Sequence, residues 1–478
     1  MPWTRVTATR LAHQLGELPG GMPAYQALAG RLRLLVAEGR LTEDTQLPSE
    51  RDLALGLRLS RTTVTRAYGE LVSTGYAVAR RGSGTVVRVP GSTHGALGGA
   101  FADRGAGDGF VDLTCAAPAA VPGVHEAFLR ATEQLPAQLR GTGYYPEGLP
   151  QLRARIAERY TRRGLATTPE QVVVTTGAQS SLAVVSRLLV RPAQLVLTES
   201  PTYPNAIETL RGAHARIVGH ALGADGWHVP TLQTSLQRGG IRLALLMPDF
   251  QNPTGALMDD ATRAHVAAVL ARCGTTALVD ESSAELALED VVVPRPFGAH
   301  APGTITVGSV SKALWGGFRV GWVRAPHELV PALVRARVTL DLGSSVVDQL
   351  AVTELFENLD AALADRRESL RLGRDAMAEA VRAHLPTWQF DLPAGGLSLW
   401  CRLPRRVAPA VVASAERHGV LLVPGGRFGV DGGLESHLRL PFTGDRERFD
   451  DAVQRISAAY AEAPERDARS SRRQPLIA

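Results

Sequence analysis

Between residues 171 and 325, short runs rich in valine, leucine and isoleucine alternate with longer segments of helical periodicity. Strands of this composition are buried on both faces, and strands that alternate with helices build a sheet with helices on either side. The pattern therefore predicts an α/β fold. The predicted strands are QVVVTTG (171–177), QLVLTES (194–200), RLALLMPD (242–249), TTALVDE (275–281), GTITVGS (303–309) and VGWVRA (320–325).

A glycine-rich stretch, PGSTHGALGGAFADRGAGDGF, holds few apolar residues and is typical of a flexible linker. The chain has 478 residues, more than one hydrophobic core usually organises, so we expect separate domains on its two sides. The predicted parts are an N-terminal extension (1–21), a winged helix-turn-helix (22–89), the linker (90–110), an α/β domain (111–464) whose smaller α+β subdomain spans about 348–464, and a disordered tail (465–478).

The segment before the linker has the pattern of a winged helix-turn-helix. Apolar residues recur at helical spacing over 25–38, and two further helices are predicted at about 50–57 and 61–74, with a tight turn between them. The next residues, YAVARRGSGTVVRV, alternate apolar and polar side chains around a glycine-rich turn, which predicts a two-stranded ribbon. In such a domain the second helix of the motif enters the major groove of DNA.

The predicted recognition helix begins with hydroxyl side chains and arginines, which suit contacts to phosphate and guanine. At any single position, a capped helix with solvated arginines is the alternative. The net charge of +5 permits nucleic-acid binding without requiring it. The predicted DNA contacts are Ser49, Arg51, Ser60, Arg61, Thr62, Thr63, Arg66 and Arg81, with Arg80 beside them at the wing tip.

Lys312, in the stretch GSVSKALWGGFRVGW, is the only lysine of the chain, although lysine and arginine together number 52. Codon bias that removed the other lysines is one explanation. The other is chemical, because arginine stays protonated, whereas a lysine amine can form a Schiff base with an aldehyde. Lys312 follows the predicted strand 303–309, and ligands of α/β sheets gather where strands end. Its position therefore favours the chemical explanation.

Polar residues follow two more predicted strands: Asp280 lies in the run 275–281, and Asn252 follows the run 242–249. Pyridoxal 5'-phosphate needs an amine for its aldehyde, a carboxylate for its ring nitrogen and a phosphate site, and these residues indicate that cofactor. Each has an ordinary structural alternative, such as a helix cap for Asp280. The predicted phosphate residues are Gly177, Ala178, Gln179, Ser309, Ser311 and Arg319, and Tyr203 is predicted to stack on the ring.

Longer stretches resemble known families. The stretch LPSERDLALGLRLSRTTVTRAYGELVSTGYAVARRGSGT resembles the GntR-type winged helix, which implies that Arg51, Arg61, Thr63 and Gly82 lie near operator DNA. From about residue 112 to 463 the chain resembles the aminotransferase fold type I of vitamin B6 enzymes, in the motifs GAQ, SPTYP, QNPTG, VDE, SVSKALWGGFRVGW, PAGGLSLW and HLRLPF. Together these parts resemble the MocR/GabR family of bacterial transcription regulators.

The resemblance implies a homodimer in which each aminotransferase-like domain binds pyridoxal phosphate through Lys312. It also implies that Asn252 meets the phenolic oxygen of the cofactor and that Arg439, in HLRLPF, holds a substrate carboxylate. Tyr144, in GYYPEGLPQLR, would reach the phosphate bound by the partner subunit. The chain departs from the family at Ser282, where many members carry a tyrosine bonded to the phenolic oxygen, so whether it transaminates stays open.

The leading hypothesis is a cytoplasmic transcription regulator that binds double-stranded operator DNA and senses pyridoxal phosphate, or an amino compound, through an aldimine at Lys312. The alternatives are an aminotransferase with an appended DNA-binding domain, and a regulator whose second half serves only as a dimerisation scaffold. Neither a bilayer-spanning apolar run nor the apolar core of a signal peptide is visible. Cys115, Cys273 and Cys401 lie far apart, so neither disulfides nor a metal site are expected.

Overall fold

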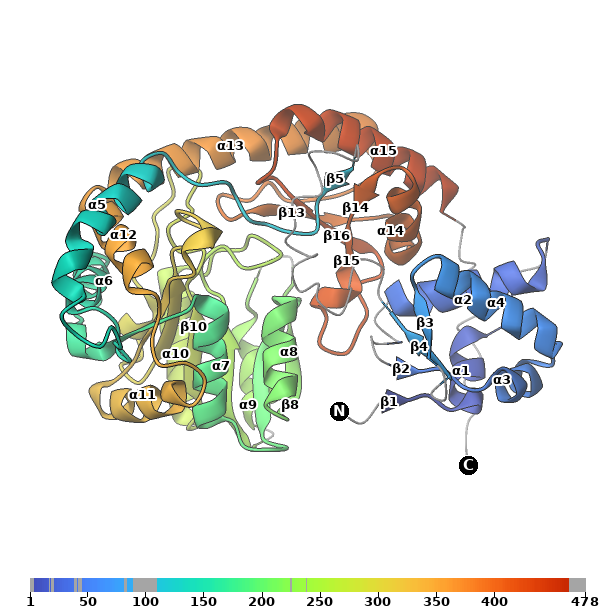
Figure 1. The fold of residues 1–478 in the computed structure, drawn as a ribbon, viewed down its shortest axis with the longest axis horizontal. Coiled ribbons are helices and arrows are strands. Elements are labelled where there is room, and N and C mark those ends of the chain that lie inside the picture. Colours follow the sequence, from blue (N-terminus) through green and yellow to red (C-terminus); the bar gives the residue numbers. More distant parts are fainter. Residues whose placement is uncertain are drawn as a thin grey trace.

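The computed structural model describes residues 4–16, 18, 21–37, 41, 45–80, 84–88, 110–223, 226–237 and 239–463. Figure 1 shows the N-terminal domain, in blue, beside the C-terminal subdomain, in red, with the large α/β domain on the far side of that subdomain. The predicted linker up to residue 109, the predicted tail, Arg81, Gly82 and the side chain of Arg80 lie outside the described residues.

The N-terminal domain is a winged helix-turn-helix, and it contains the three helices and the ribbon predicted from the sequence. Its helices are α1 (Ala8–Leu15), α2 (Ala24–Ala37), α3 (Glu50–Leu57) and α4 (Arg61–Ser73). Its sheet has the strand order β1-β2-β4-β3, with β1 (Thr4–Arg5), β2 (Thr45–Gln46), β3 (Ala77–Arg80) and β4 (Gly84–Val87).

Part of the predicted N-terminal extension belongs to the core of this domain. Leu11 and Leu15 of α1 are fully buried, and α1 packs against α3. The sequence pattern was weak here because a helix of eight residues presents only these two core positions.

The α/β domain has a seven-stranded sheet with the order β6-β12-β11-β10-β9-β7-β8. All neighbours are parallel except β12, which runs antiparallel to β6 and β11. Six strands correspond to the six predicted runs, and β8 is an additional, largely exposed edge strand. The strands are β6 (Val172–Thr175), β7 (Leu195–Ser200), β8 (Arg216–Ala221), β9 (Ile241–Leu246), β10 (Thr276–Asp280), β11 (Ile305–Ser309) and β12 (Gly321–Arg324).

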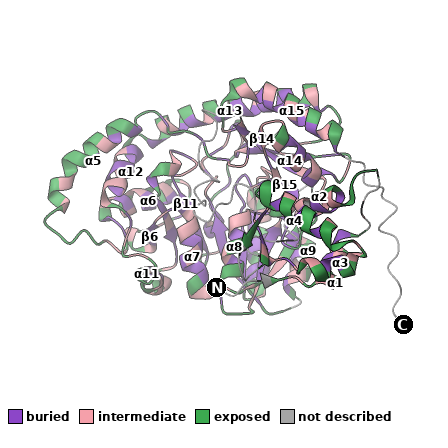
Figure 2. Ribbon diagram, turned by 45° about the vertical axis from the view of Figure 1, so that its right-hand side comes forward, coloured by how far each residue is buried: buried purple, intermediate pink, exposed green. Residues whose placement is uncertain are grey.

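Helices cover both faces of this sheet, as the alternating pattern predicted. One face packs against α7 (Ala178–Leu189), α8 (Pro204–Gly212) and α11 (Val330–Val338), and the other packs against α9 (Val229–Gln237) and α10 (Asp260–Arg272). Figure 2 shows the resulting burial of the strands between the helical layers. The carboxyl ends of the parallel strands therefore share one edge, where the polar motifs emerge.

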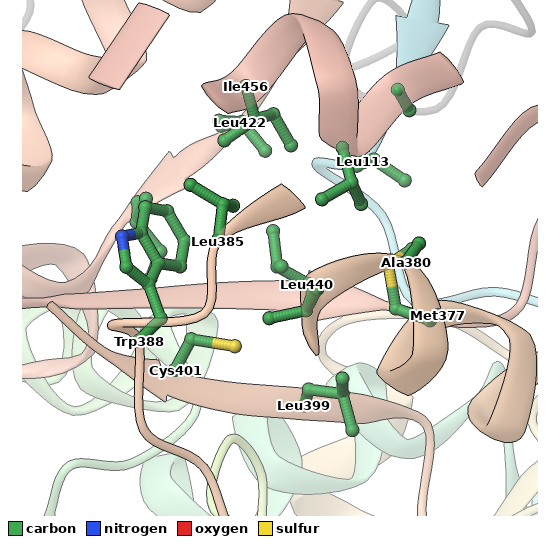
Figure 3. Packing of buried hydrophobic residues seen from close by; sticks show 14 of the residues in the cluster. Leu113, Met377, Ala380, Leu385, Trp388, Leu399, Cys401, Leu422, Leu440 and Ile456 are labelled. Atoms are coloured by element: carbon green, nitrogen blue, oxygen red, sulfur yellow. The ribbon is translucent and has the colours of Figure 1, made fainter. Parts of the chain in front are cut away.

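The C-terminal subdomain packs around a separate core, of which Figure 3 shows ten labelled residues, among them Met377, Trp388, Cys401 and Leu440. Its elements are α13 (Leu359–His384), β13 (Ser398–Arg402), α14 (Ala408–Arg417), β14 (Val420–Leu421), β15 (Val423–Pro424), β16 (His437–Pro441) and α15 (Phe449–Glu462). A strand from far earlier in the chain, β5 (Val111–Asp112), pairs in parallel with β14.

The change from one core to the other occurs within α13, between Leu363 and Leu370, rather than near residue 348. The preceding helix, α12 (Val346–Glu357), packs against α5 (Val124–Gln138) and α6 (Pro150–Arg162) of the large domain. The sequence alone did not separate these helices because the same apolar spacing serves either core.

The winged helix contacts the C-terminal subdomain through α2, which packs against α14. At this contact the Tyr76 hydroxyl donates a hydrogen bond to Glu416 Oε2 at 3.5 Å. Within the described part of the chain, no helix is long and apolar enough to cross a membrane.

Candidate functional site

Lys312 lies just after β11, at the carboxyl edge of the sheet, where its Nζ donates a hydrogen bond to the Ala116 carbonyl at 2.7 Å. Burial lowers the pKa of this amine from its usual value. The charge of Arg439 lowers this pKa further, while Cys115 and Asp280 act in the opposite direction. The deprotonated fraction at neutral pH is therefore larger than for an exposed lysine, which is what a Schiff-base nucleophile needs.

Asp280 ends β10, the strand next to β11, so its carboxylate and the Lys312 amine emerge at the same edge. Burial raises the pKa of Asp280, whereas the charge of Lys312 lowers it. The Ser282 backbone N–H donates to Asp280 Oδ1 at 2.8 Å, but the buried Ser282 hydroxyl finds no partner among the described residues. A ligand that reaches this point would meet a carboxylate and a free hydroxyl.

The loop before α7 lies against Arg319. Gly177 has a φ of +86°, and a Cβ there would lie 2.7 Å from a terminal nitrogen of Arg319. Arg319 also donates to the Thr176 carbonyl at 3.1 Å. α7 starts at Ala178, so its first backbone N–H groups have no partner within the helix. The Gln179 side chain lies against α8, where its Nε2 donates to Thr209 Oγ1 at 2.5 Å. The positive φ favours glycine at this position, and the loop with the start of α7 forms a cradle suited to a phosphate.

Two serines continue the cradle on the Lys312 side. The Ser309 hydroxyl donates to Ser311 Oγ at 2.9 Å and contacts the Val320 carbonyl at 3.2 Å, and the Ser311 N–H donates back to Ser309 Oγ at 3.0 Å. Ser309 ends β11, and Ser311 directly precedes Lys312. These side chains are the short donors that a phosphate oxygen would meet beside Arg319.

Tyr203 and Asn252 lie at the ends of two further strands. The Tyr203 hydroxyl accepts a hydrogen bond from Asn205 Nδ2 at 2.9 Å, and burial raises its pKa. The charge of Asp280 raises this pKa as well, whereas the charge of Arg439 lowers it. Asn252 Oδ1 accepts from Arg439 Nη1 at 3.4 Å.

Arg439, on β16, is the positive group of the small subdomain that faces this site. It is only 6 % exposed, donates to the Thr114 carbonyl at 2.5 Å and lies 5.0 Å from the centre of the Phe428 ring. Burial lowers its pKa to about 10, so it stays charged at neutral pH. Its Nε is buried without a partner among the described residues. Such a group is available to a carboxylate.

Tyr144 behaves differently from the other predicted site residues. Its side chain is 64 % exposed in the single chain, and its backbone N–H donates a hydrogen bond to Thr142 Oγ1 at 3.4 Å. The structure of one chain therefore leaves it apart from Lys312, and the expected role towards a partner subunit stays a prediction.

The predicted DNA-contact residues lie mainly at the starts of α3 and α4, where the exposed arginines Arg51 and Arg61 stand beside Glu50 and Asp52. Ser60 caps α4: its Oγ accepts from the Thr63 N–H at 3.1 Å and lies 2.8 and 2.7 Å from the hydroxyls of Thr62 and Thr63. The Arg61 side chain is 72 % exposed and lies 3.6 Å from Glu50. Hydroxyls and N–H groups at a helix start, beside an exposed arginine, suit a phosphate backbone.

Three more predicted DNA residues flank that helix start. Ser49 caps α3 by accepting from the Asp52 N–H at 3.2 Å, and Arg51 is exposed in the first turn of α3. Arg66 is exposed on α4, with its guanidinium 3.9 Å from the Tyr25 ring centre. The described members of the predicted set thus lie at the starts of α3 and α4 or, for Arg66, further along α4.

The sequence did not predict several residues that form hydrogen bonds to the side chains of this site or support its loops. Thr114 and Ala116 contribute backbone carbonyls to Arg439 and Lys312, and carbonyl contacts leave no mark in a sequence. Glu199 and Gln251 form a buried pair that stands inside two motifs already singled out, ESPTYP and QNPTG. These two residues could have been identified from the sequence, because Glu199 stands close to the predicted cofactor residue Tyr203 and Gln251 stands directly before Asn252.

The site fits a phosphorylated aldehyde with a basic ring. It offers a buried amine, a carboxylate on the next strand and a glycine cradle beside an arginine. At this edge of the sheet, Ser282 Oγ and Arg439 Nε are buried and have no partner among the described residues. Buried polar atoms are nearly always bonded in native proteins, so a ligand or ordered water would satisfy these two.

Comparison with known proteins gives a consistent assignment. The family of class I and II aminotransferases matches residues 120–456, and the gntR family of bacterial regulatory proteins matches residues 24–87. A 2-aminoadipate transaminase of Thermus thermophilus is 33 % identical over 321 residues, which cover 66 % of this chain and 80 % of that protein. The probable rhizopine catabolism regulatory protein MocR of Rhizobium meliloti is 29 % identical over 431 residues, 84 % of this chain and 86 % of the relative.

A solved structure supports the same fold and cofactor. LysN, an α-aminoadipate aminotransferase from Thermus thermophilus complexed with N-(5'-phosphopyridoxyl)-L-leucine, superposes with a TM-score of 0.67 at 31 % identity, over 74 % of this chain and 92 % of LysN. The fold type I architecture and the pyridoxal phosphate cofactor predicted from the sequence are thereby confirmed. The chain belongs to the aminotransferase class I and II family and carries a GntR-family DNA-binding domain in front of it, the arrangement of MocR-type regulators.

Proposed function

We propose that this protein is a pyridoxal-phosphate-dependent transcription regulator of the MocR type. Its winged helix binds operator DNA, and its aminotransferase-like domain takes pyridoxal phosphate, or an amino compound, as the signal. The observation that carries the proposal is the fusion, in one chain, of a recognition helix that begins with exposed hydroxyls and an exposed arginine with a partly buried lysine at the carboxyl edge of an aminotransferase sheet. In this setting the protein works in the cytoplasm.

Pyridoxal phosphate, when bound, supplies an electrophilic aldehyde and a ring that withdraws electrons. In this proposal the Lys312 amine would hold the cofactor at its aldehyde carbon, Asp280 would keep a proton on the ring nitrogen, and Arg439 would bind the carboxylate of an amino compound. Tyr203 would cover the ring face, and Asn252 would meet the phenolic oxygen, which Ser282 is too short to reach as a tyrosine would. The phosphate ligands are Gly177, Ala178, Gln179, Ser309, Ser311 and Arg319.

The stretch of chain that begins with β5 supports a route from this site to the winged helix. Its carbonyls at Thr114 and Ala116 accept hydrogen bonds from Arg439 and Lys312, so a ligand on either residue competes with these bonds. Leu113 anchors the same stretch in the core of the small subdomain (Figure 3). β5 pairs with β14, which directly follows α14, the helix against which α2 of the winged helix packs.

The proposed assembly is a homodimer. Exposed apolar side chains occur on α5, at the end of α11 and in the loops that follow these helices, and a second copy of the chain could cover them. They are Leu129, Leu139, Tyr144, Val338, Leu340 and Leu342, each more than 40 % exposed. A second copy that covers this face would bring Tyr144 to the phosphate site of its partner. Sedimentation of the purified protein tests this, and a monomer at micromolar concentration would contradict it.

An aminotransferase with an appended DNA-binding domain is the second candidate. The 33 % identity to a transaminase and the buried arginine Arg439 favour it. Ser282, which is too short to replace a tyrosine at the phenolic oxygen, counts against efficient turnover. Steady-state transamination with a panel of amino donors, without sequence-specific DNA retention, would make this the better account.

The decisive experiment is a DNA footprint on the region upstream of the protein's own gene, with and without pyridoxal phosphate. We expect a protected site whose protein concentration for half-protection changes on adding the cofactor. Lys312→Ala should keep a footprint but lose the response. If the footprint is the same with and without pyridoxal phosphate, and also with a panel of amino compounds, the proposed sensing is wrong. That result would support the alternative in which the aminotransferase-like half serves only as a dimerisation scaffold.

A further inference from the structure

Glu199, at the carboxyl end of β7, is a fully buried acidic residue to which the proposed function assigns no role. Its carboxylate accepts three hydrogen bonds. Oε1 accepts from Trp227 Nε1 at 2.8 Å and from the Met247 N–H at 2.9 Å, and Oε2 accepts from Gln251 Nε2 at 3.2 Å. A buried carboxylate costs free energy unless its lone pairs are bonded, so these donors define where the side chain sits.

Gln251, the residue directly before Asn252, has its side-chain amide bonded at both ends. Its Nε2 also donates to the Pro201 carbonyl at 2.8 Å, and its Oε1 accepts from the N–H and the hydroxyl of Thr254 at 3.1 and 2.8 Å. The amide therefore sits at the centre of its own loop. If Gln251 moves, Asn252 moves with it.

The same contacts reach the loop that carries Tyr203. Pro201, which accepts from Gln251, is two residues before Tyr203, and the Thr202 N–H donates to the Phe428 carbonyl at 2.9 Å. The Phe428 ring in turn lies 5.0 Å from the Arg439 guanidinium. One buried network thus joins two strand-end loops of the large domain to the arginine of the small subdomain.

We propose that Glu199 is a positioning residue of the cofactor site, whose ionised carboxylate holds the loops that carry Tyr203 and Asn252 in one arrangement. This inference rests on the cofactor site proposed above, because it concerns the residues that support that site. It assigns no contact between Glu199 and the cofactor. Its effect passes through Gln251.

The proposed positioning role depends on the protonation state of Glu199, because only the ionised carboxylate accepts all three hydrogen bonds. Burial raises its pKa to about 7, and the charge of Asp280 adds to the rise. His220 faces it from β8, where the two residues are register partners, and burial lowers the pKa of that imidazole. When Glu199 is protonated, its carboxyl carries a donor, and one of its three hydrogen bonds is lost. Looser positioning of Asn252 is therefore expected as the pH falls through 7.

The test is Glu199→Gln, which keeps size and shape. Its carbonyl can still accept from Trp227 and Met247, but its amide nitrogen then faces the Nε2 of Gln251, donor against donor. We expect an affinity for pyridoxal phosphate that is about tenfold lower, the loss of one hydrogen bond to a charged group. The visible circular dichroism of the bound cofactor should change with pH through about 7 in the wild type and stay constant in the variant.

Two further variants keep the test sharp. Glu208→Gln makes the same chemical change on the surface of α8, where Glu208 is 57 % exposed and paired with Arg211, and should match the wild type. Gln251→Met removes the donor from the other side of the contact and should reproduce the weaker binding even if Glu199→Gln does not fold.

Three outcomes decide the question. Weaker binding together with a flat pH profile in Glu199→Gln supports the positioning role. Wild-type affinity and a wild-type pH profile in both Glu199→Gln and Gln251→Met would overturn it and leave Glu199 a purely structural residue. Wild-type protein that binds no pyridoxal phosphate would instead overturn the proposed function, and this inference with it.

Discussion

The cofactor site and the recognition helix use cationic side chains in opposite ways. Arg439 is 6 % exposed, and burial lowers its pKa as it lowers that of Lys312. The Arg61 side chain is 72 % exposed, so water solvates its charge, and it lies 3.6 Å from Glu50. Buried charges interact strongly with few partners, while exposed charges interact weakly and are screened by salt. Single substitutions should therefore act strongly on the first site and weakly on the second.

The largest effect is expected for Lys312→Arg. Arginine keeps the positive charge but cannot bond to the aldehyde carbon, so the absorbance band due to the covalent bond with Lys312 should vanish, leaving the spectrum of the free aldehyde, while some phosphate-dependent affinity remains. Absorbance spectra with added pyridoxal phosphate measure this, and unchanged far-ultraviolet circular dichroism serves as the folding control. If the band survives, the buried lysine is not the covalent site.

Arg439→Gln should come next. Removing a buried charge that binds a carboxylate costs about 2 kcal/mol or more, roughly thirtyfold in affinity. A panel of amino acids should shift the spectrum of the bound cofactor at much lower concentration in the wild type than in the variant. Arg402→Gln, an exposed arginine on the neighbouring strand β13, is the matched control. If both substitutions weakened the binding of amino acids equally, the predicted difference between buried and exposed charges would be wrong.

The pH dependence of stability is a third test of buried charge. Because the pKa of Glu199 rises from 4.5 to about 7 in the folded protein, the folded state binds its proton more tightly than the unfolded chain. This contribution to stability is complete below pH 4.5 and is lost as the pH rises through 7. Urea unfolding should therefore show the wild type losing up to about 3 kcal/mol relative to Glu199→Gln between about pH 5 and 8. A constant difference across this range would contradict the shift.

Arg61→Ala should have a smaller effect, on DNA alone. Operator affinity should fall severalfold, with the dependence of log affinity on log salt shallower by about one unit, while cofactor absorbance is unchanged. Filter binding at several salt concentrations measures both quantities. Arg211→Ala on α8 is the control, since that exposed arginine lies outside the winged helix. Unchanged binding at every salt concentration would mean that α4 is not the recognition helix.

The smallest effect is expected for Tyr76→Phe, which sharpens the comparison by testing the link between the two regions. It deletes one 3.5 Å hydrogen bond to Glu416, a contact worth about 1 kcal/mol at most. DNA affinity without ligand should change by less than about threefold, but the ratio of affinities with and without pyridoxal phosphate should move towards one. A ratio identical to the wild type would show that this contact carries no signal.

The sequence predicted the elements better than the cores. Six predicted strands and the helices of the winged motif are present, because apolar periodicity is a local property. The helix at 8–15 was missed, and α12 was assigned to the wrong subdomain, since both decisions depend on which distant core accepts an apolar face. Among site residues, Lys312, Asp280 and Arg439 could be named from motifs, whereas the carbonyls of Thr114 and Ala116 could not.

The sequence by itself determined the chemistry on offer: a single lysine after a strand, a carboxylate on another strand, a glycine before a helix and a run of hydroxyls and arginines at a helix start. Only the tertiary structure decided which of these groups are removed from water and have shifted pKa values. Arg439 and Glu199 are ordinary residues in a list of letters, and they differ from Arg61 and Glu208 only because packing removes water from them. Desolvation depends on everything that surrounds a side chain, and so no local stretch of sequence contains it.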